Sequence, residues 1–180
     1  MEYFVFTIEE CEKTFGVDKS LSRPKQISLL AKQKLLSILK EKGLSFDTTI
    51  AVGKKGKPYF INFPHLHFSI SHSSTHIALA LDDKEIGIDI ENLRTCNLNL
   101  AKRYFHQEEY EYLLSIEEDK RNEAFTKIWT QKEAFVKCTG EGIAGGFNKF
   151  SVIVDSSTID KKYKTQYQAK DYHLSLCFEV

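Results

Sequence analysis

The sequence predicts an α+β fold built from two similar halves. Segments rich in β-branched and aromatic residues alternate with amphipathic helical segments, and each half contains a helix, a glycine-containing turn and then strands. The order LLSILKEKG, GKPYF, FSIS, HIALAL in the first half parallels WTQKEAFVKCTGEGI, KFSVIV, HLSLCFEV in the second. Residue identity between these series is low, so duplication is a hypothesis about element order. We expect a single domain over 1–180 with halves at 1–83 and 84–180.

Local signals predict the individual elements. The first helix has Ser22 as a plausible N-cap, Pro24 in its first turn and Gly43 at its end. We expect strands at residues 3–8, 48–60 (running into a Gly, Lys and Pro turn), 68–71, 75–81, 86–91, 149–154 and 173–180. We expect helices at residues 23–43, 98–105, 107–114 and 118–139.

Composition restricts the function classes only loosely. The chain has 180 residues, is 42% hydrophobic and has a formal net charge of zero, which is typical of a globular protein and gives no indication of nucleic-acid or membrane binding. The four cysteines are far apart in sequence, which favours free thiols in a reducing compartment. The N-terminus carries acids where a signal peptide needs bases, and no apolar run is long enough for a membrane span. We therefore expect a cytoplasmic protein.

One predicted strand carries two acids on the same face. In EIGIDIEN, Ile86, Ile88 and Ile90 alternate with Gly87 and with the acids Asp89 and Glu91. Acids are depleted in strands, and like charges on one face repel, so the pattern is costly unless a cation lies beside it. Magnesium prefers such oxygen ligands. The alternative is a solvated strand face.

The long helix carries a further carboxylate with two lysines. Lys132 falls in the apolar stripe of the helix, so that it either extends to the surface or faces a buried anion. Glu133 and Lys137 lie at the edge of the stripe, four residues apart. They form either a surface ion pair or a carboxylate and a cation at the wall of a cleft.

A third cluster combines Lys57 with Ser71 and His72 at a strand end, where short polar side chains suit phosphate binding. Two histidine spacings, His65-x-His67 and His72-x-x-x-His76, leave a zinc site open as a minor alternative. The segment around His76 is rich in strand formers, which disfavours the helix that the second spacing needs.

The order of these motifs is more specific than any of them alone. GKPYF, FSISHS, IGIDIE and WTQKEAFVKCTGEGI, at these intervals, resemble the 4′-phosphopantetheinyl transferases, and the larger class typified by the surfactin-synthetase enzyme more than the short trimeric synthases. The resemblance implies two halves related by a pseudo-twofold axis, with the active site at their interface. It implies transfer of 4′-phosphopantetheine from coenzyme A to a serine of an apo acyl- or peptidyl-carrier protein, with release of adenosine 3′,5′-bisphosphate.

The resemblance also implies residue roles. It implies magnesium ligation by Asp89, Glu91 and Glu133, and catalysis by Glu133, Lys137 and Glu109. It implies that coenzyme A is bound by Lys57, Pro58, Ser71, His72 and Lys137, and we add Lys132 because of its place in the apolar stripe. The family arginine that holds the 3′-phosphate aligns near Ile27, so Arg23, Lys25 or Lys32 is a candidate substitute.

Glu109 has a competing structural interpretation. It matches a proposed family base, but HQEE also fits a helix start in which His106 is the N-cap and Glu109 occupies the N3 position of a capping box. Aromatic residues of this region, Tyr104, Phe105, Tyr110 and Tyr112, are candidates for a carrier-protein groove, and core packing explains them equally well.

Two other functions fit the same residues. The three carboxylates and the lysine would also serve a magnesium-dependent phosphohydrolase acting on coenzyme A or a nucleotide. A non-catalytic module that binds carrier proteins or coenzyme A is the third hypothesis, and the complete carboxylate set argues against it. We expect a monomer, and the sequence leaves the identity of the carrier protein open.

Overall fold

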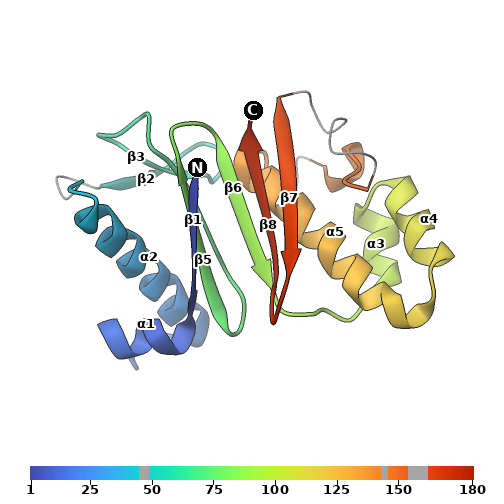
Figure 1. Ribbon diagram of the computed structural model, residues 1–180, viewed down its shortest axis with the longest axis horizontal. Helices are drawn as coiled ribbons and strands as arrows, with labels where there is room; N and C mark the ends of the chain where they lie inside the picture. Colours follow the sequence, from blue (N-terminus) through green and yellow to red (C-terminus); the bar gives the residue numbers. More distant parts are fainter. Residues whose placement is uncertain (45–48, 143–145, 154–161) are drawn as a thin grey trace.

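The computed structural model describes residues 1–44, 49–142, 146–153 and 162–180. Within these residues, two three-stranded antiparallel sheets lie between layers of helices, and a two-stranded antiparallel sheet is formed by strands β2 and β3 (Figure 1). The strands are β1 (Glu2–Thr7), β2 (Ile50–Val52), β3 (Pro58–Phe60), β4 (His67–His72), β5 (His76–Asp82), β6 (Ile86–Glu91), β7 (Tyr163–Ala169) and β8 (His173–Glu179). The helices are α1 (Ile8–Phe15), α2 (Arg23–Glu41), α3 (Leu98–Tyr104), α4 (Gln107–Ser115), α5 (Glu118–Thr139) and the 3₁₀ turn η2 (Phe147–Lys149). The mixture of helix and sheet that the sequence predicts is therefore present.

The two sheets have the same strand order. The first half pairs its strands as β1-β5-β4 and the second as β6-β8-β7, so that the last strand of each half lies in the middle of its sheet. Helices separate the first strand from the later two in both halves. This agreement supports the element-order hypothesis, while the pseudo-twofold axis and the boundary near Asp83 stay predictions.

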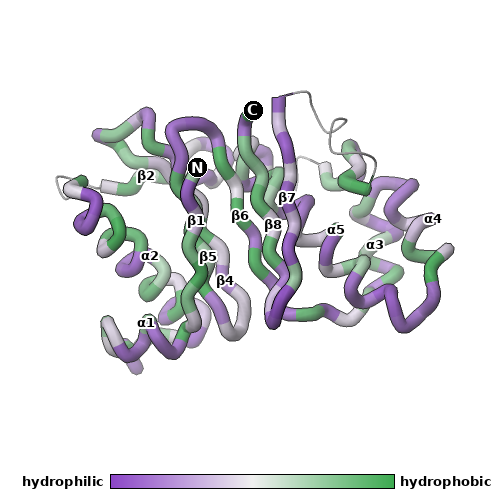
Figure 2. The backbone as a smooth tube through the Cα atoms, in the orientation of Figure 1, coloured by the Kyte–Doolittle hydropathy of each residue, from purple (hydrophilic) through white to green (hydrophobic). Residues whose placement is uncertain are grey.

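Three clusters of buried side chains hold the layers together. One lies between α1, α2 and the first sheet, and another joins α3, α4 and α5 to the second sheet. The third fills the space between the sheets, where Ala78 and Ala80 of β5 meet Ile86, Ile88 and Ile90 of β6. Figure 2 shows hydrophobic segments along these central strands and alternation along the outer helices.

Gly87 allows α5 to pack closely onto β6. A Cβ atom at this position would lie 2.0 Å from the backbone oxygen of Ala134 and 2.5 Å from the backbone nitrogen of Cys138. The glycine therefore makes room for a helix backbone. Gly140 ends α5 in a left-handed conformation, which is common for a helix C-cap.

The structure corrects two sequence-based expectations. The strand expected at 149–154 is absent from the described part of that range, where residues 149–153 contain the end of η2 and irregular backbone; Val154 lies outside the described residues. The strand that follows is instead β7, in the polar segment YKTQYQA (Tyr163–Ala169). Helix α1 was not expected, although Thr7 and Glu10 form a complete capping box at its start.

Within the residues that the structure describes, no helix is long and apolar enough to cross a membrane. The four cysteines are free thiols, as the sequence predicts.

Candidate active site

A cavity of about 290 Å³ lies where the two halves meet. The first half contributes the turn before β3 and part of β4, and the second half contributes the last turns of α5 and the residues after it. The lining residues are Lys55, Gly56, Lys57, Pro58, Phe68, Ser69, Ile70, Glu133, Val136, Lys137, Gly140 and Gly142. The cavity thus contains four of the residues predicted from the sequence: Lys57, Pro58, Glu133 and Lys137.

Serine side chains join β4 to β6 beside this cavity. The Ser69 hydroxyl accepts a hydrogen bond from the Ile88 backbone N–H (3.0 Å), and the Ser71 hydroxyl accepts one from the Ile90 N–H (3.3 Å). These bonds satisfy buried backbone donors of β6 that the strand order leaves at the edge of its sheet. They also fix the distance between the two strands that carry the polar site residues.

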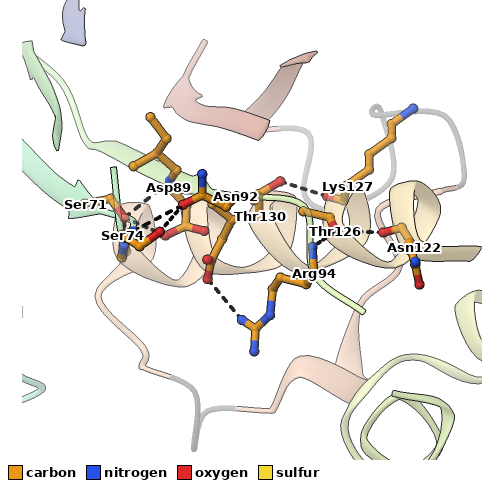
Figure 3. A network of polar contacts seen from close by, with 12 residues as sticks. Ser71, Ser74, Asp89, Asn92, Arg94, Asn122, Thr126, Lys127 and Thr130 are labelled. Carbon is orange, nitrogen blue, oxygen red and sulfur yellow. Dashed lines mark hydrogen bonds and ion pairs between the residues drawn. The ribbon is translucent and has the colours of Figure 1, made fainter. Parts of the chain in front are cut away.

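Asp89 is the centre of a buried polar network (Figure 3). Ser71 Oγ donates a hydrogen bond to Asp89 Oδ1 (2.8 Å), and Lys137 Nζ donates to both Asp89 Oδ1 (2.7 Å) and Ser71 Oγ (2.8 Å). Asp89 Oδ2 is buried and has no hydrogen-bond partner among the described residues. A buried carboxylate oxygen without a partner is costly, and a bound cation would satisfy it.

Glu133 is electrostatically coupled to the strand carboxylates. Burial and, after it, the negative charges of Asp89 and Glu91 raise the pKa of Glu133 to about 7, although Lys137 and Arg94 oppose the shift. Burial and the charge of Asp89 likewise raise the pKa of Glu91. The charges of the three acids therefore influence one another's pKa values, as those of ligands of a shared cation would.

The side chains as they lie are not yet arranged around an ion. No group of three or more His, Cys, Asp or Glu side chains within the described ranges is placed to hold a metal ion. Instead of a metal ion, side-chain cations lie beside the acids: Lys137 contacts Asp89, and Arg94 Nη1 lies 3.0 Å from Glu91 Oε1. The ligation of magnesium by Asp89, Glu91 and Glu133 stays a prediction.

Lys57 and His72 lie on the first-half side of the site. Lys57 Nζ forms an ion pair with Glu85 and donates to the Cys138 carbonyl oxygen (2.6 Å), which connects the turn before β3 to the end of α5. His72 is exposed at the end of β4; partial burial of its ring and the nearby charge of Lys137 lower its pKa. The imidazole is thus favoured in its neutral form at neutral pH.

Lys132 and Glu109 lie away from the cavity, in the protein interior. Both side chains are 0% exposed, with Lys132 Nζ 2.9 Å from Glu109 Oε2. Lys132 also donates to the carbonyl oxygens of Phe147 and Phe150 (both 2.6 Å), which uses its three donors. The expectation of a buried anion beside Lys132 is correct, but this placement does not fit a coenzyme A contact.

The remaining contacts of Glu109 support its structural interpretation. Its carboxylate accepts hydrogen bonds from the backbone N–H of His106 (2.9 Å) and of Val152 (2.7 Å), and His106 caps α4 as the capping-box alternative predicts. Burial raises the pKa of Glu109, opposed by Lys132. A carboxylate in these contacts has no path to a substrate, so its assignment as the base does not fit this structure.

Other predicted residues fall outside the site. Arg23 forms an ion pair with Glu12 of α1, at the end of α2 that lies away from the β2–β3 hairpin (Figure 1). Lys25 and Lys32 are exposed on α2. His72 and His76 lie on two antiparallel strands, which removes the helical spacing that the zinc alternative needed.

The aromatic residues of the predicted partner groove divide into two groups. Phe105 is buried and Tyr110 packs against the same core, in agreement with the core-packing alternative. Tyr104 and Tyr112 are 39% and 41% exposed.

Sequence reasoning missed Ser69, Glu85 and Arg94. Ser69 precedes Ser71 by two residues on one strand, a spacing that places both on the same face. Glu85 gave no local signal, because its partner Lys57 is distant in sequence. Arg94 had one local signal, its position three residues after Glu91, while its other partner Trp129 is distant.

The chain is similar in sequence to known 4′-phosphopantetheinyl transferases. The chain is 40% identical over 110 residues to a 4′-phosphopantetheinyl transferase of Bacillus subtilis, covering 61% of this chain and 47% of the relative. It is 38% identical over 106 residues to 4′-phosphopantetheinyl transferase Sfp of Bacillus subtilis strain 168 (59% and 47%), and 36% identical over 131 residues to 4′-phosphopantetheinyl transferase AcpT of Escherichia coli O157:H7 (71% and 65%). The chain spans about half the length of the two Bacillus relatives.

The family assignment rests on a separate match. The profile described as the 4′-phosphopantetheinyl transferase superfamily matches residues 85–178, just over half of the chain. This range contains β6 and α5, the two elements that carry the carboxylates and Lys137. The chain therefore belongs to the 4′-phosphopantetheinyl transferase superfamily.

Proposed function

We propose that the protein transfers 4′-phosphopantetheine from coenzyme A to a serine of an apo acyl- or peptidyl-carrier protein and releases adenosine 3′,5′-bisphosphate. The observation that carries the proposal is the meeting of Asp89, Glu133 and Lys137 at a cavity between the halves of a chain from this family. The clustering of perturbed acids and a lysine in a cleft is typical of an active site.

The chemistry of the residues fits a magnesium ion. Asp89 Oδ2 is an acceptor without a partner among the described residues, and the pKa of Glu133 is raised by burial and by the neighbouring acids, which a cation would offset. Asp89, Glu91 and Glu133 would hold the ion. When bound, it would neutralise the diphosphate of coenzyme A and stabilise charge that develops on the departing phosphate.

The chain's own groups have separate tasks in the transfer. The carrier serine oxygen forms a bond to the phosphorus that bears pantetheine, and the bond from that phosphorus to the bridging oxygen breaks. The bridging oxygen leaves with adenosine 3′,5′-bisphosphate. Lys137 balances charge on this leaving oxygen, and its proximity to Asp89 and Ser71 keeps it in place.

The serine proton needs an acceptor. A carboxylate oxygen of Glu133 that the ion leaves free could accept it, since Glu133 lines the cavity. Glu109 is not a candidate, because it is enclosed by Lys132 and two backbone donors.

Binding of coenzyme A would use the first-half wall of the cavity. Lys57 and Pro58 line this side, with neighbouring Lys55 as an additional cation for phosphates. Ser71 and His72 follow the lining residue Ile70 at the end of β4 and would extend this wall. The carrier protein would approach α3 and α4, where Tyr104 and Tyr112 are exposed. A monomer has the complete cavity, since both walls come from one chain.

The test is mass spectrometry of several apo carrier proteins after incubation with coenzyme A and the protein, with and without magnesium. The expected result is a magnesium-dependent mass increase of one phosphopantetheine on at least one carrier. Free phosphopantetheine released without any carrier would instead support the phosphohydrolase. Absence of both products over a broad panel of carriers would contradict the proposed activity.

A further inference from the structure

Arg94 is a cation at the carboxylate cluster that the proposed function does not use. It follows β6 by three residues, and its guanidinium Nη1 lies 3.0 Å from Glu91 Oε1. Its side chain is 35% exposed and that of Glu91 is 27% exposed, so this pair lies at the rim of the cluster and contacts solvent. Figure 3 shows Arg94 alongside α5, with Asp89 and Ser71 to its left in the view.

Contacts that do not involve Glu91 hold Arg94 in place. Its guanidinium carbon lies 4.4 Å from the centroid of the Trp129 ring, a cation–π arrangement. Its backbone N–H donates to Thr126 Oγ1 (3.0 Å), and the Cys96 N–H two residues later donates to Asn122 Oδ1 (2.8 Å). The segment after β6 is thus fixed along α5, and the positive charge would stay beside the cluster if Glu91 turned away.

Arg94 lies where its positive charge would repel a divalent ion bound to Glu91. Glu91 is one of the three carboxylates that the proposed function assigns to magnesium, and its Oε1 is engaged by the guanidinium. Lys137 likewise engages Asp89 Oδ1. The two side-chain cations therefore balance the charges of Asp89 and Glu91 in the absence of metal, and a divalent ion has to overcome their repulsion and replace at least the rim pair.

Resting on the proposed metal site, we propose that Arg94 is an internal counter-ion that competes with magnesium for Glu91. Binding of the ion breaks the Arg94–Glu91 pair and leaves the guanidinium beside Trp129 without its counter-charge, which changes the electrostatic environment of the indole. Arg94 in this way lowers the affinity of the free enzyme for magnesium, so that the ion binds best when the coenzyme A diphosphate adds negative charge.

The chain offers its own reporter for this exchange, because Trp129 is its single tryptophan. Magnesium titrations of the metal-free protein are followed by calorimetry and by Trp129 emission at pH 8.5, above the pKa of Glu133. The variants are Arg94→Gln, which removes the charge, and Arg94→Lys, which keeps the charge but loses the planar guanidinium. Arg103→Gln is the matched control, since Arg103 also lies over an aromatic ring, that of Tyr104, on α3.

We expect Arg94→Gln to bind magnesium on the order of 5-fold more tightly than the wild type, the size expected for removing one nearby, partly screened charge. Arg94→Lys and Arg103→Gln should stay within about 2-fold of the wild type by the same reasoning. Wild-type emission should change with magnesium along the calorimetric curve, and Arg94→Gln emission should be insensitive to the ion.

Two results would overturn the competition while the metal site stands. One is equal or weaker magnesium binding by Arg94→Gln, and the other is wild-type emission that is unchanged at saturating magnesium. A different result would overturn the metal site: binding that is absent in the wild type and in Arg94→Gln, both with and without coenzyme A. That outcome would contradict the magnesium dependence in the proposed function as well.

Discussion

Helix α5 takes part in two acid–lysine clusters that differ in how completely their charges are paired. In the interior cluster, Lys132 meets Glu109, and both charges have complete sets of partners at 0% exposure. In the cavity cluster, Lys137 meets Asp89, one Asp89 oxygen has no partner among the described residues, and Glu133 has a pKa near 7. The first is closed and suits a structural role, whereas the second lacks positive charge and suits ligand binding.

The comparison teaches that adjacent positions on a helix can serve opposite purposes. Lys132 and Glu133 are neighbours in sequence, but a step of about 100° around the axis turns one toward η2 and the other toward the cavity. The clusters contain the same kinds of charge but differ in burial, since Lys132 and Glu109 are 0% exposed and Lys137 is 29% exposed. They also differ in the completeness of hydrogen bonding, which predicts which cluster a substitution will disable and how.

The largest expected effect is the loss of transfer in Glu133→Gln. The substitution keeps the size of the side chain but removes the charge needed for a cation and for proton acceptance. We expect turnover of an apo carrier protein to fall by about 1,000-fold or more, as when a group acting mainly in the transition state is removed. Mass spectrometry of holo-carrier formation measures the rate.

The matched control is Glu118→Gln, an exposed acid in the first turn of the same helix, which should keep wild-type turnover. Glu133→Gln should also keep a cooperative thermal transition at or above that of the wild type, because it relieves repulsion from Asp89. Near-normal turnover in Glu133→Gln would show that the cavity cluster is not needed for transfer, and the two clusters would then not differ in function.

The second effect is on stability and concerns the interior cluster. Lys132→Met leaves Glu109 buried without its cation, and removal of one partner of a buried pair costs about 3–5 kcal/mol. The free energy of unfolding from urea titrations should fall by that amount. The double variant Lys132→Met/Glu109→Leu should be less destabilised than the sum of the single changes, because no isolated charge is left.

Activity decides whether the interior cluster is only structural. Turnover per folded molecule of Glu109→Gln should stay within about 10-fold of the wild type, because the carboxylate does not reach the cavity. A fall in turnover of several hundred-fold with an unchanged free energy of unfolding would restore Glu109 as a catalytic group. It would contradict the purely structural role of the interior cluster.

The sequence revealed the cavity cluster better than the interior one, for a physical reason. Alternation around Asp89 and Glu91 and the glycine that ends α5 are local signals, and both elements lie where the sequence predicts them. The pair of Lys132 with Glu109 depends on how α4 packs against α5, which no periodicity encodes. The sequence therefore offered a buried anion beside Lys132 only as one of two alternatives and did not identify it.

The errors in secondary structure have similar causes. Residues 149–153 include apolar side chains that suit a strand, but the carbonyl oxygens of Phe150 and of nearby Phe147 accept hydrogen bonds from Lys132, and the backbone follows that contact. Strand β7 escaped notice because it is an edge strand with one covered face, with Tyr163, Thr165 and Tyr167 partly buried among polar neighbours. Tertiary contacts decided both segments.

The smallest expected effect is a pH dependence of stability that belongs to Glu133. Its pKa is about 7 in the folded protein against an ordinary value of 4.5, so between these values the folded state binds a proton that the unfolded state has released. The free energy of unfolding of metal-free protein should therefore decrease as pH rises through this window, in total by about 1–3 kcal/mol. Urea titrations in EDTA at several pH values measure the slope.

Other groups titrate in the same range, so the difference between wild type and Glu133→Gln isolates this contribution. The variant should show a flatter profile and exceed wild-type stability above pH 7, because it has no charge to confine near Asp89. Magnesium should restore wild-type stability at high pH by mass action, since it binds the folded state, and should do little for the variant. Equal slopes in the two proteins would mean that Glu133 is solvated like an ordinary surface acid, and the cavity cluster would then lack the deficit of positive charge that separates it from the interior pair.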